Sequence, residues 1–177
     1  MISDITKDLN TQEANNMGIW QDPITGLMWQ DELYTQNEEE AFSNNKNYGK
    51  LGDWKYAKQY CKELRLGGYS DWRLPNIYEL LTLLDNTKDE EPYIIDGLQH
   101  INAPFCWSST VCKGNKFAWF VVFEVGDNGT DNKCYRLYIR AVRGKVIDPD
   151  TLVSLHERGF LNVSQKNLNR HIFFYNT

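Results

Sequence analysis

Hydrophobic and polar positions along the chain first predict a strand pair and then two helices. Residues 18–30 carry two short apolar runs around a Pro/Gly turn, which is typical of paired strands. Asp53 is a favourable helix N-cap, and apolar residues follow it at helical spacing until Gly67, so we predict a helix over residues 54–66. Apolar residues recur at the same spacing from residue 77 to 84, which predicts a second helix.

The second half of the chain predicts three strands and a polar hairpin loop. Residues 105–110 form a short strand-like segment, and residues 117–125 are apolar and β-branched, as expected of a central strand. Residues 135–143 alternate between aliphatic and polar side chains, which is the pattern of a strand with one buried face. Between the last two strands, residues 126–133 are interpreted as a polar hairpin loop. Two helices packed with a small antiparallel sheet make an α+β domain.

Four further segments are polar or irregular. Residues 1–17 are polar and aperiodic, and we interpret them as a leader or arm. Residues 31–52 contain three consecutive glutamates and are interpreted as a solvated insertion loop, because charge runs usually lie on the surface. Residues 86–103 form a long irregular region, and residues 145–177 are an unassigned C-terminal extension with a short helix near residues 151–158. The domain is expected to lie between the first and the last of these segments.

The sequence GGYSDWRLPN joins the two predicted helices. Asn76 and Glu79 have the spacing of a helix capping box, although that motif usually begins with Ser or Thr. Trp72 is expected to fill the core beneath the helices, while the charges beside it satisfy the backbone or each other. The alternative is a recognition triplet, since Trp and Arg dominate binding hot spots. We favour the structural interpretation for Asp71, Trp72, Arg73, Pro75 and Asn76.

Composition restricts the class of protein. The 177 residues are 41% hydrophobic and 14% aromatic, which fits one globular domain and not a disordered chain. A net charge of −5 disfavours broad nucleic-acid binding. The longest apolar run, residues 118–123, is too short to span a bilayer, so membrane insertion is not expected. No secretion signal is visible, which leaves a cytosolic protein or a piece of a longer chain as alternatives.

The four cysteines show no C-x-x-C pair and no zinc-type spacing. If all four were paired, three connectivities would be available, and the sequence does not choose among them. Cys112 and Cys134 flank the central strand pair, and such positions can lie opposite each other in an antiparallel hairpin. We therefore predict a disulfide bond between them in an exported protein, with Cys61 reduced and buried in the first helix.

Catalytic motifs are weak in this chain. The sequence has neither a G-x-S-x-G elbow nor an H-E-x-x-H motif, and it contains only three histidines. His100, Cys106 and Cys112 are six residues apart, which matches no standard metal site. A cysteine nucleophile assisted by His100 is the remaining enzymatic alternative. We therefore predict neither an enzyme nor a metal site of this kind.

The polar loop offers oxygen ligands for a cation. Its candidate calcium ligands are Asp127, Asn128, Asp131 and Asn132. Such residues also serve turn geometry alone, and no EF-hand pattern is present, so we expect no cofactor and keep calcium as the alternative. The Trp-Ser-Ser run at residues 107–109 and Trp119 could line a sugar-stacking surface, although buried sheet aromatics are commoner.

Five motifs occur together in a recognisable order: TGLMWQ (25–30), AKQYCKELRLGGYSDWRLPNIYELLTLLD (57–85), WSST (107–110), AWFVVFEVG (118–126) and IRAVRG (139–144). With them, residues 18–144 resemble the bacterial domain family named after the C-terminal domain of a Legionella collagen-like adhesin. The resemblance implies a C-type lectin-like fold in proteins that are secreted, periplasmic or surface-attached. It also implies binding or adhesion more than catalysis.

One departure from the family concerns the cysteines. Relatives often have a cysteine between the two arginines of the last strand, and this chain has Ala141 there. Cys61 resembles the first-helix cysteine of the family and has thus lost its usual partner. The family's disulfide pattern is therefore not carried over to this chain.

The resemblance also places a binding surface. In lectin-like folds, recognition generally belongs to the long loop region and its adjoining strands. Arg136, Tyr138 and Arg140 share one face of the last predicted strand, where Arg and Tyr can bind sugar hydroxyls or a carboxylate. Arg140 can instead be a structural partner of Asp71 or Glu79. We predict a shallow binding surface built from Asp127, Asn128, Asp131, Arg136 and Tyr138.

Three function classes remain. The first, which we favour, is a non-catalytic ligand-binding or adhesion module of a bacterial envelope, periplasmic or secreted protein, with a glycan or a surface protein as ligand. The second is a structural or assembly domain of a larger surface protein. The third is a cysteine-dependent enzyme.

Overall fold

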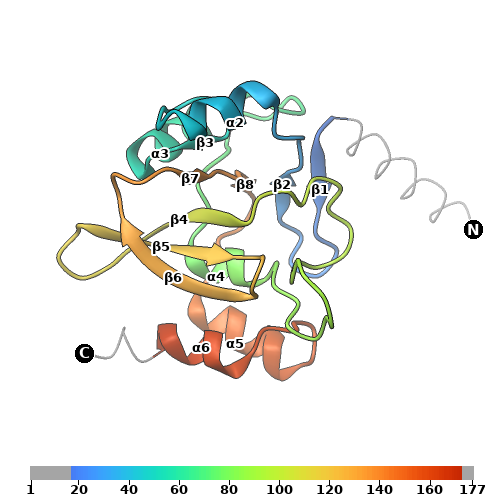
Figure 1. The fold of residues 1–177 in the computed structure, drawn as a ribbon. Helices are drawn as coiled ribbons and strands as arrows, with labels where there is room; N and C mark the ends of the chain where they lie inside the picture. Colours follow the sequence, from blue (N-terminus) through green and yellow to red (C-terminus); the bar gives the residue numbers. More distant parts are fainter. Residues whose placement is uncertain (1–16, 173–177) are drawn as a thin grey trace, which may run out of the picture.

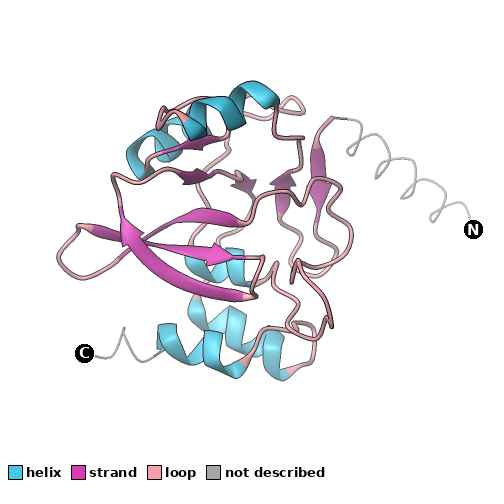
Figure 2. Cartoon of the chain, in the orientation of Figure 1, coloured by secondary structure: helices cyan, strands magenta, loops and turns pink. Residues whose placement is uncertain are grey.

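The computed structural model describes residues 17–172 and shows a mixed α/β fold with two sheets and, within this range, five helices. Figure 2 shows the strands between two groups of helices. No helix in the described range is long and apolar enough to cross a membrane. The predicted leader, residues 1–17, lies outside the described residues except for its last position.

The smaller sheet confirms the predicted N-terminal strand pair. Its strands, in order across the sheet, are β1 (Ile19–Gln21), β2 (Met28–Gln30) and β8 (Val142–Arg143). All neighbours pair antiparallel, and Trp20 of β1 lies opposite Trp29 of β2. Both tryptophans are buried, so the apolar side chains that predicted this strand pair pack in the core.

The larger sheet has five strands. In order across the sheet they are β3 (Leu51–Gly52), β7 (Leu137–Tyr138), β4 (Phe105–Val111), β5 (Phe117–Val122) and β6 (Asp127–Asn132). β4 and β7 pair in parallel, and the other neighbours pair antiparallel. The strand predicted over residues 135–143 is split between the two sheets, because the chain crosses from one to the other at residues 139–141.

The helices confirm part of the prediction. They are α2 (Gln36–Ser43), α3 (Trp54–Glu63), α4 (Ile77–Leu81), α5 (Pro149–Glu157) and α6 (Gln165–Ile172). α3, α4 and α5 are the predicted helices, with α3 and α4 ending earlier than expected. The prediction of only two helices in the domain is wrong, because α2 was missed. Figure 1 shows α2 and α3 at one end of the molecule and α5 and α6 at the other.

Residues 31–52 are not a solvated loop. α2 begins there with a capping box, in which the Glu38 carboxylate accepts a hydrogen bond from Thr35 N at 2.7 Å and the Thr35 side chain accepts from Glu38 N. Glu38 is only 3% exposed, and its carboxylate lies 3.0 Å from Lys50 Nζ. The prediction was wrong because Glu38, one glutamate of the charge run, is buried, caps α2 and pairs with Lys50.

Residues 127–132 are not a hairpin loop but the edge strand β6. All six pair with β5, from Phe117 opposite Asn132 to Val122 opposite Asp127. The turn lies earlier, at residues 123–126, where Gly126 has a positive φ of 63°. Pairing with an apolar central strand has overridden the turn preference of Asp, Asn and Gly.

The predicted Cys112–Cys134 disulfide is absent, and all four cysteines, which lie within the described residues, are free thiols. Cys112 N donates to Phe117 O of β5 at 3.0 Å, while Cys134 follows β6 on the other side of β5. The central strand therefore lies between the two cysteines, whereas the prediction placed them at the end of one hairpin. Cys61 is buried and reduced, as predicted.

The junction between α3 and α4 is exposed at residues 68–71 and then enters the core at Trp72. Trp72 is 3% exposed, and its Nε1 donates to Leu66 O at 3.2 Å. Asn76 caps α4 and forms the predicted capping box with Glu79. Arg73 binds both oxygens of the Glu79 carboxylate at 2.6 Å. Arg73 of the junction is thus bonded to Glu79 across the helix cap.

The C-terminal extension shares the core of the domain. Leu152 of α5 and Leu168 of α6 are each 2% exposed and belong to the same hydrophobic cluster as Leu80 of α4 and Val121 of β5. The Asn76 amide donates to Ile147 O at 2.8 Å, which ties the start of the extension to the cap of α4. Residues 145–172 are therefore joined to the domain by both apolar packing and hydrogen bonds.

Replacing Trp72 by alanine is expected to lower the free energy of unfolding by about 3–5 kcal/mol, because it opens a cavity that the core closes only in part. Denaturant titration followed by circular dichroism measures the change. Tyr135→Ala is the matched control, since it truncates an aromatic side chain that is 57% exposed, and it should stay within about 0.5 kcal/mol of the parent. Equal midpoints for the two variants would show that Trp72 does not support the core.

The buried Glu38 carboxylate predicts a specific loss of stability in acid. Burial acts to raise its pKa, but the hydrogen bonds from Thr35 and Lys50 and the charge of Lys50 outweigh burial, so the pKa is lowered. Because the folded pKa lies below the unfolded value of about 4.3, the contribution of this group is fully present above that value. It is lost as pH falls through the folded pKa.

The test compares the free energy of unfolding of the parent and of Glu38→Gln between about pH 6 and about pH 3. Glutamine keeps one acceptor oxygen for Thr35 N and removes the charge, so the stability advantage of the parent should shrink as pH falls. Glu40→Gln, at an exposed position of the same helix, should show no such change. A constant difference between the parent and Glu38→Gln would rule out the proposed linkage.

Candidate binding surface

The residues predicted to form a binding surface lie in separate places. Two of them, Asp127 and Asn128, bind side chains of α6. Asp127 forms ion pairs with Lys166 at 2.7 Å and with Arg170 at 2.9 Å. Burial acts to raise the pKa of Asp127, but the hydrogen bond from Lys166 and the two nearby cations outweigh it and lower the pKa. Asn128 is 3% exposed, and its amide donates to Asn167 at 2.9 Å.

Asp131 lies near the other end of β6. Its Oδ1 accepts from Asn132 N at 2.7 Å, just as Asp127 Oδ1 accepts from Asn128 N at 2.8 Å. Asp127 and Asn128 are engaged with α6, whereas Asp131 and Asn132 lie at the other end of the strand, so the four side chains do not converge. In the part of the chain that the structure describes, no three His, Cys, Asp or Glu side chains are placed to hold a metal ion.

Arg136 and Tyr138 both bond to the α2 region, and Tyr138 is buried there. Arg136 Nη1 donates to Asn45 Oδ1 at 2.7 Å, just beyond the end of α2. Tyr138 is 7% exposed, its hydroxyl donates to the Glu39 carboxylate, and its ring packs edge-on against Tyr34 with centroids 4.9 Å apart. Burial, together with the charge of Glu39, raises the pKa of Tyr138. The prediction of an exposed face was wrong because α2 covers it.

Arg140 is a structural residue, as the alternative interpretation expected, but its partner is Asp31. The side chain is 2% exposed, donates to Gln30 O at 2.9 Å and lies 3.4 Å from the Asp31 carboxylate. It also donates to His100 O. Residues 31 and 100 belong to segments that were interpreted as irregular, so the partner was not foreseen.

Asp71 and Glu79, the carboxylates predicted as alternative partners of Arg140, pair with other arginines. Asp71 pairs with Arg143 at 2.7 Å, and Glu79 pairs with Arg73 at 2.6 Å. Pro75, the remaining residue of the junction, is buried. Asp71, Trp72, Arg73 and Asn76 of the junction thus each bond to another part of the fold.

The other candidate residues are also mostly buried. Trp107 is fully buried and donates its Nε1 to Gly52 O at 3.1 Å, so its ring offers no face for a sugar. Trp119 is half-buried on β5. Burial raises the pKa of Cys61 and raises the pKa of Cys106 to about 11. Neither thiol therefore supplies a thiolate near neutral pH, which is the form that acts as a nucleophile.

A surface that the sequence analysis missed surrounds Trp54, the first residue of α3. Asp53 caps this helix, and Trp54 Nε1 donates to Ser108 O at 2.8 Å, which fixes the indole against β4. The ammonium groups of Lys58 and Lys133 lie 4.7 and 4.0 Å from the centroid of the Trp54 ring. Two cations thus converge on one indole.

The tip of the β4–β5 hairpin extends this cationic surface. Lys133 Nζ donates to Asn115 Oδ1 at 2.7 Å, and Lys133 N donates to Lys116 O at 3.2 Å. Lys113 and Lys116 are exposed on the tip, which projects from the body of the molecule in Figure 1. We call these residues the lysine–tryptophan surface: Trp54, Lys58, Lys113, Lys116 and Lys133.

Charge on the lysine–tryptophan surface is not balanced locally. Within residues 17–170, no Asp or Glu forms an ion pair with any of its four lysines. Burial and the nearby charge of Lys58 lower the pKa of Lys133. Val111, Phe117 and Tyr135 lie within two residues of its lysines in the sequence and are 42%, 43% and 57% exposed. A cationic, partly aromatic surface therefore exists on a chain with a net charge of −5.

Comparison with known proteins agrees with the motifs of the sequence. The sequence pattern of the Lcl C-terminal domain family matches residues 18–143, which is most of the chain. This range includes both sheets, the three helices α2 to α4 and the lysine–tryptophan surface. No curated protein matches the sequence significantly. The chain therefore belongs to the Lcl C-terminal domain family.

Proposed function

We propose that this chain is a non-catalytic attachment module that binds an anionic glycan through the lysine–tryptophan surface. The observation that carries the proposal is the convergence of the Lys58 and Lys133 ammonium groups on the Trp54 ring, with no carboxylate partner among the described residues. Ammonium groups bind carboxylate and sulfate groups, and the exposed rings beside them can pack against sugar rings.

Membership of the Lcl C-terminal domain family supports an adhesion-related module of a bacterial surface or secreted protein. The glycan ligand and a C-type lectin-like architecture go beyond that membership and are part of the proposal. An assembly role within a larger surface protein stays a prediction.

The clustering of like charges favours an anionic ligand for a physical reason. Four lysines without carboxylate partners repel one another, and a polyanion that spans them relieves this repulsion. Because the charges lie at the surface, salt should weaken binding: the Debye length falls from about 10 Å at 0.1 M to about 3 Å at 1 M. Binding through apolar packing alone would lack this dependence.

Replacing both Lys58 and Lys133 by glutamine should weaken binding to an anionic polysaccharide by about tenfold or more, because each lost charge removes a surface interaction on the order of 1 kcal/mol. Surface plasmon resonance with immobilised dextran sulfate and polygalacturonate measures the effect at low and high salt. Neutral dextran should not bind. The melting temperature should be nearly unchanged, since both side chains lie near the surface.

The matched control is the Lys62→Gln, Lys145→Gln double variant, which removes the same charge from exposed positions outside the surface. It should bind within about twofold of the parent. Equal losses in the two double variants would mean that only total charge matters. Unchanged binding in the Lys58, Lys133 variant would place the ligand elsewhere.

A further inference from the structure

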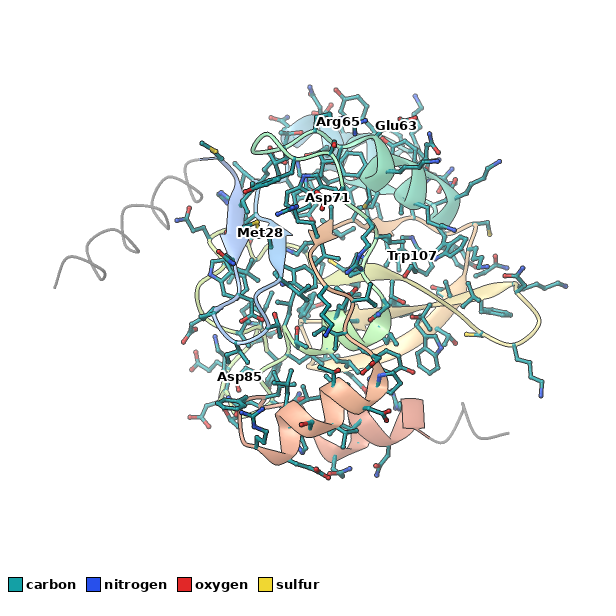
Figure 3. All side chains as sticks on the ribbon, turned by 180° about the vertical axis from the view of Figure 1, so that it is seen from behind. Met28, Glu63, Arg65, Asp71, Asp85 and Trp107 are labelled. Carbon is teal, nitrogen blue, oxygen red and sulfur yellow. The ribbon has the colours of Figure 1, made fainter. Side chains whose placement is uncertain are left out.

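A cleft of about 140 Å³ lies where the Lcl-type domain meets its C-terminal extension. One wall is the turn between β1 and β2, and the other is the connection between α5 and α6. Asp85, labelled in Figure 3, marks this end of the molecule, because it forms a backbone bridge with Asn162 of that connection. The cleft is far smaller than the roughly 300–1,000 Å³ of typical small-molecule sites, so it fits a single side chain.

The walls of the cleft combine apolar and aromatic groups. Trp20 and Leu161 are 6% and 7% exposed and form its deeper part. Ile24, on the β1–β2 turn, and Phe160, on the α5–α6 connection, both line the cleft and are each 46% exposed. Exposed apolar groups on both sides of a narrow opening suit the hydrocarbon stem of a guest side chain.

Asp22 supplies a buried negative charge at this cleft. It lines the cleft and is 2% exposed, and its two carboxylate oxygens accept hydrogen bonds from Ile24 N at 2.8 Å and Thr25 Oγ1 at 2.6 Å. No Lys, Arg or His of residues 17–170 forms an ion pair with it. A buried charge is costly unless it is paired, and each carboxylate oxygen can accept a second hydrogen bond.

Two other groups on the cleft lining, one carboxylate and one aromatic ring, already contact cations of this chain. Asp96, on the lining, pairs with Lys88 at 2.8 Å, and the Arg158 guanidinium lies 4.7 Å from the centroid of the Phe160 ring. Asp89, Glu90 and Glu91 line a neighbouring hollow of the surface, and they belong to the segment 88–96, which carries four carboxylates and one lysine and leads to the cleft. Asp96 and Phe160 thus each contact a cation of this chain, whereas the buried Asp22 carboxylate has no cation among the ion pairs of residues 17–170.

We propose that this cleft binds a basic side chain, lysine or arginine, presented by a partner protein. The stem of the guest packs between Ile24 and Phe160, and its cationic head pairs with Asp22. The face is acidic, so it complements a basic partner surface, whereas the lysine–tryptophan surface takes anions. The inference does not depend on the proposed glycan function, because it rests on different residues.

The test titrates the full chain with Nα-acetyl-lysine N-methylamide and follows the Trp20 indole N–H signal by nuclear magnetic resonance. Saturable shifts with a dissociation constant on the order of millimolar are expected for one side chain. The norleucine analogue, which has a similar stem without the charge, should bind about tenfold more weakly or not at all. Equal binding of the two analogues would overturn the proposal.

Two variants and one control locate the site. Asp22→Asn should weaken binding of the lysine analogue by about fivefold or more, while Asp89→Asn, which removes a rim charge outside the cleft, should stay within about twofold. If Asp22→Asn fails to fold, Phe160→Ala decides the matter: a several-fold loss supports the cleft, and unchanged affinity overturns it. Equal losses of affinity in Asp22→Asn and Asp89→Asn would also overturn it, since the loss would then reflect the overall negative charge of this face and not the Asp22 carboxylate.

Discussion

The carboxylate of Glu79 is fully buried, and three parts of the chain bind to it. Arg73 reaches it from the junction before α4, Asn76 N from the helix cap, and Ile147 N from the C-terminal extension. A buried charge is stable only when its partners are all in place, and loss of one partner of such a pair costs about 3–5 kcal/mol. The junction, α4 and the extension therefore depend on one another's position.

Arginine–carboxylate pairs repeat this arrangement along the last strands. Arg140 holds Asp31 inside the protein, and Arg143 holds Asp71 at the surface, where the carboxylate side chain is 60% exposed. The first pair is dry and fixes the crossing between the two sheets, whereas the second is screened by water and contributes little. In a chain whose cysteines are all free, such pairs provide the links between segments far apart in the sequence.

Local signals predicted the parts of the fold that local chemistry determines. The cap at Asp53, the box at Asn76 and the first strand pair all follow from residues close in sequence. α2 was missed although Thr35 and Glu38 have capping-box spacing, because its polar composition resembles a surface loop. β6 was missed because its Asp, Asn and Gly residues favour turns, and only its pairing with β5 makes it a strand.

The sites were harder to predict than the elements, since they join distant residues. Trp54 and Lys58 are four residues apart on α3, which is a detectable signal, but Lys133 reaches the same ring from a different element. Tyr138 was placed on an open face because α2 was not expected to cover it. Side-chain partners across such separations are set by tertiary packing, which the spacing of residues does not encode.

The edge strand β6 has a consequence for how copies of this chain behave at high concentration. An open strand edge is a template that can add a strand from a neighbouring chain. Here the side chains of Asp127 and Asp131 bind the N–H groups of Asn128 and Asn132, and Arg170 of the extension binds Asn128 O. Backbone groups of the outermost strand are thus already engaged from within. The extension, which lies beyond the family-matched range, occupies one acceptor of this edge and so leaves fewer free groups for strand addition.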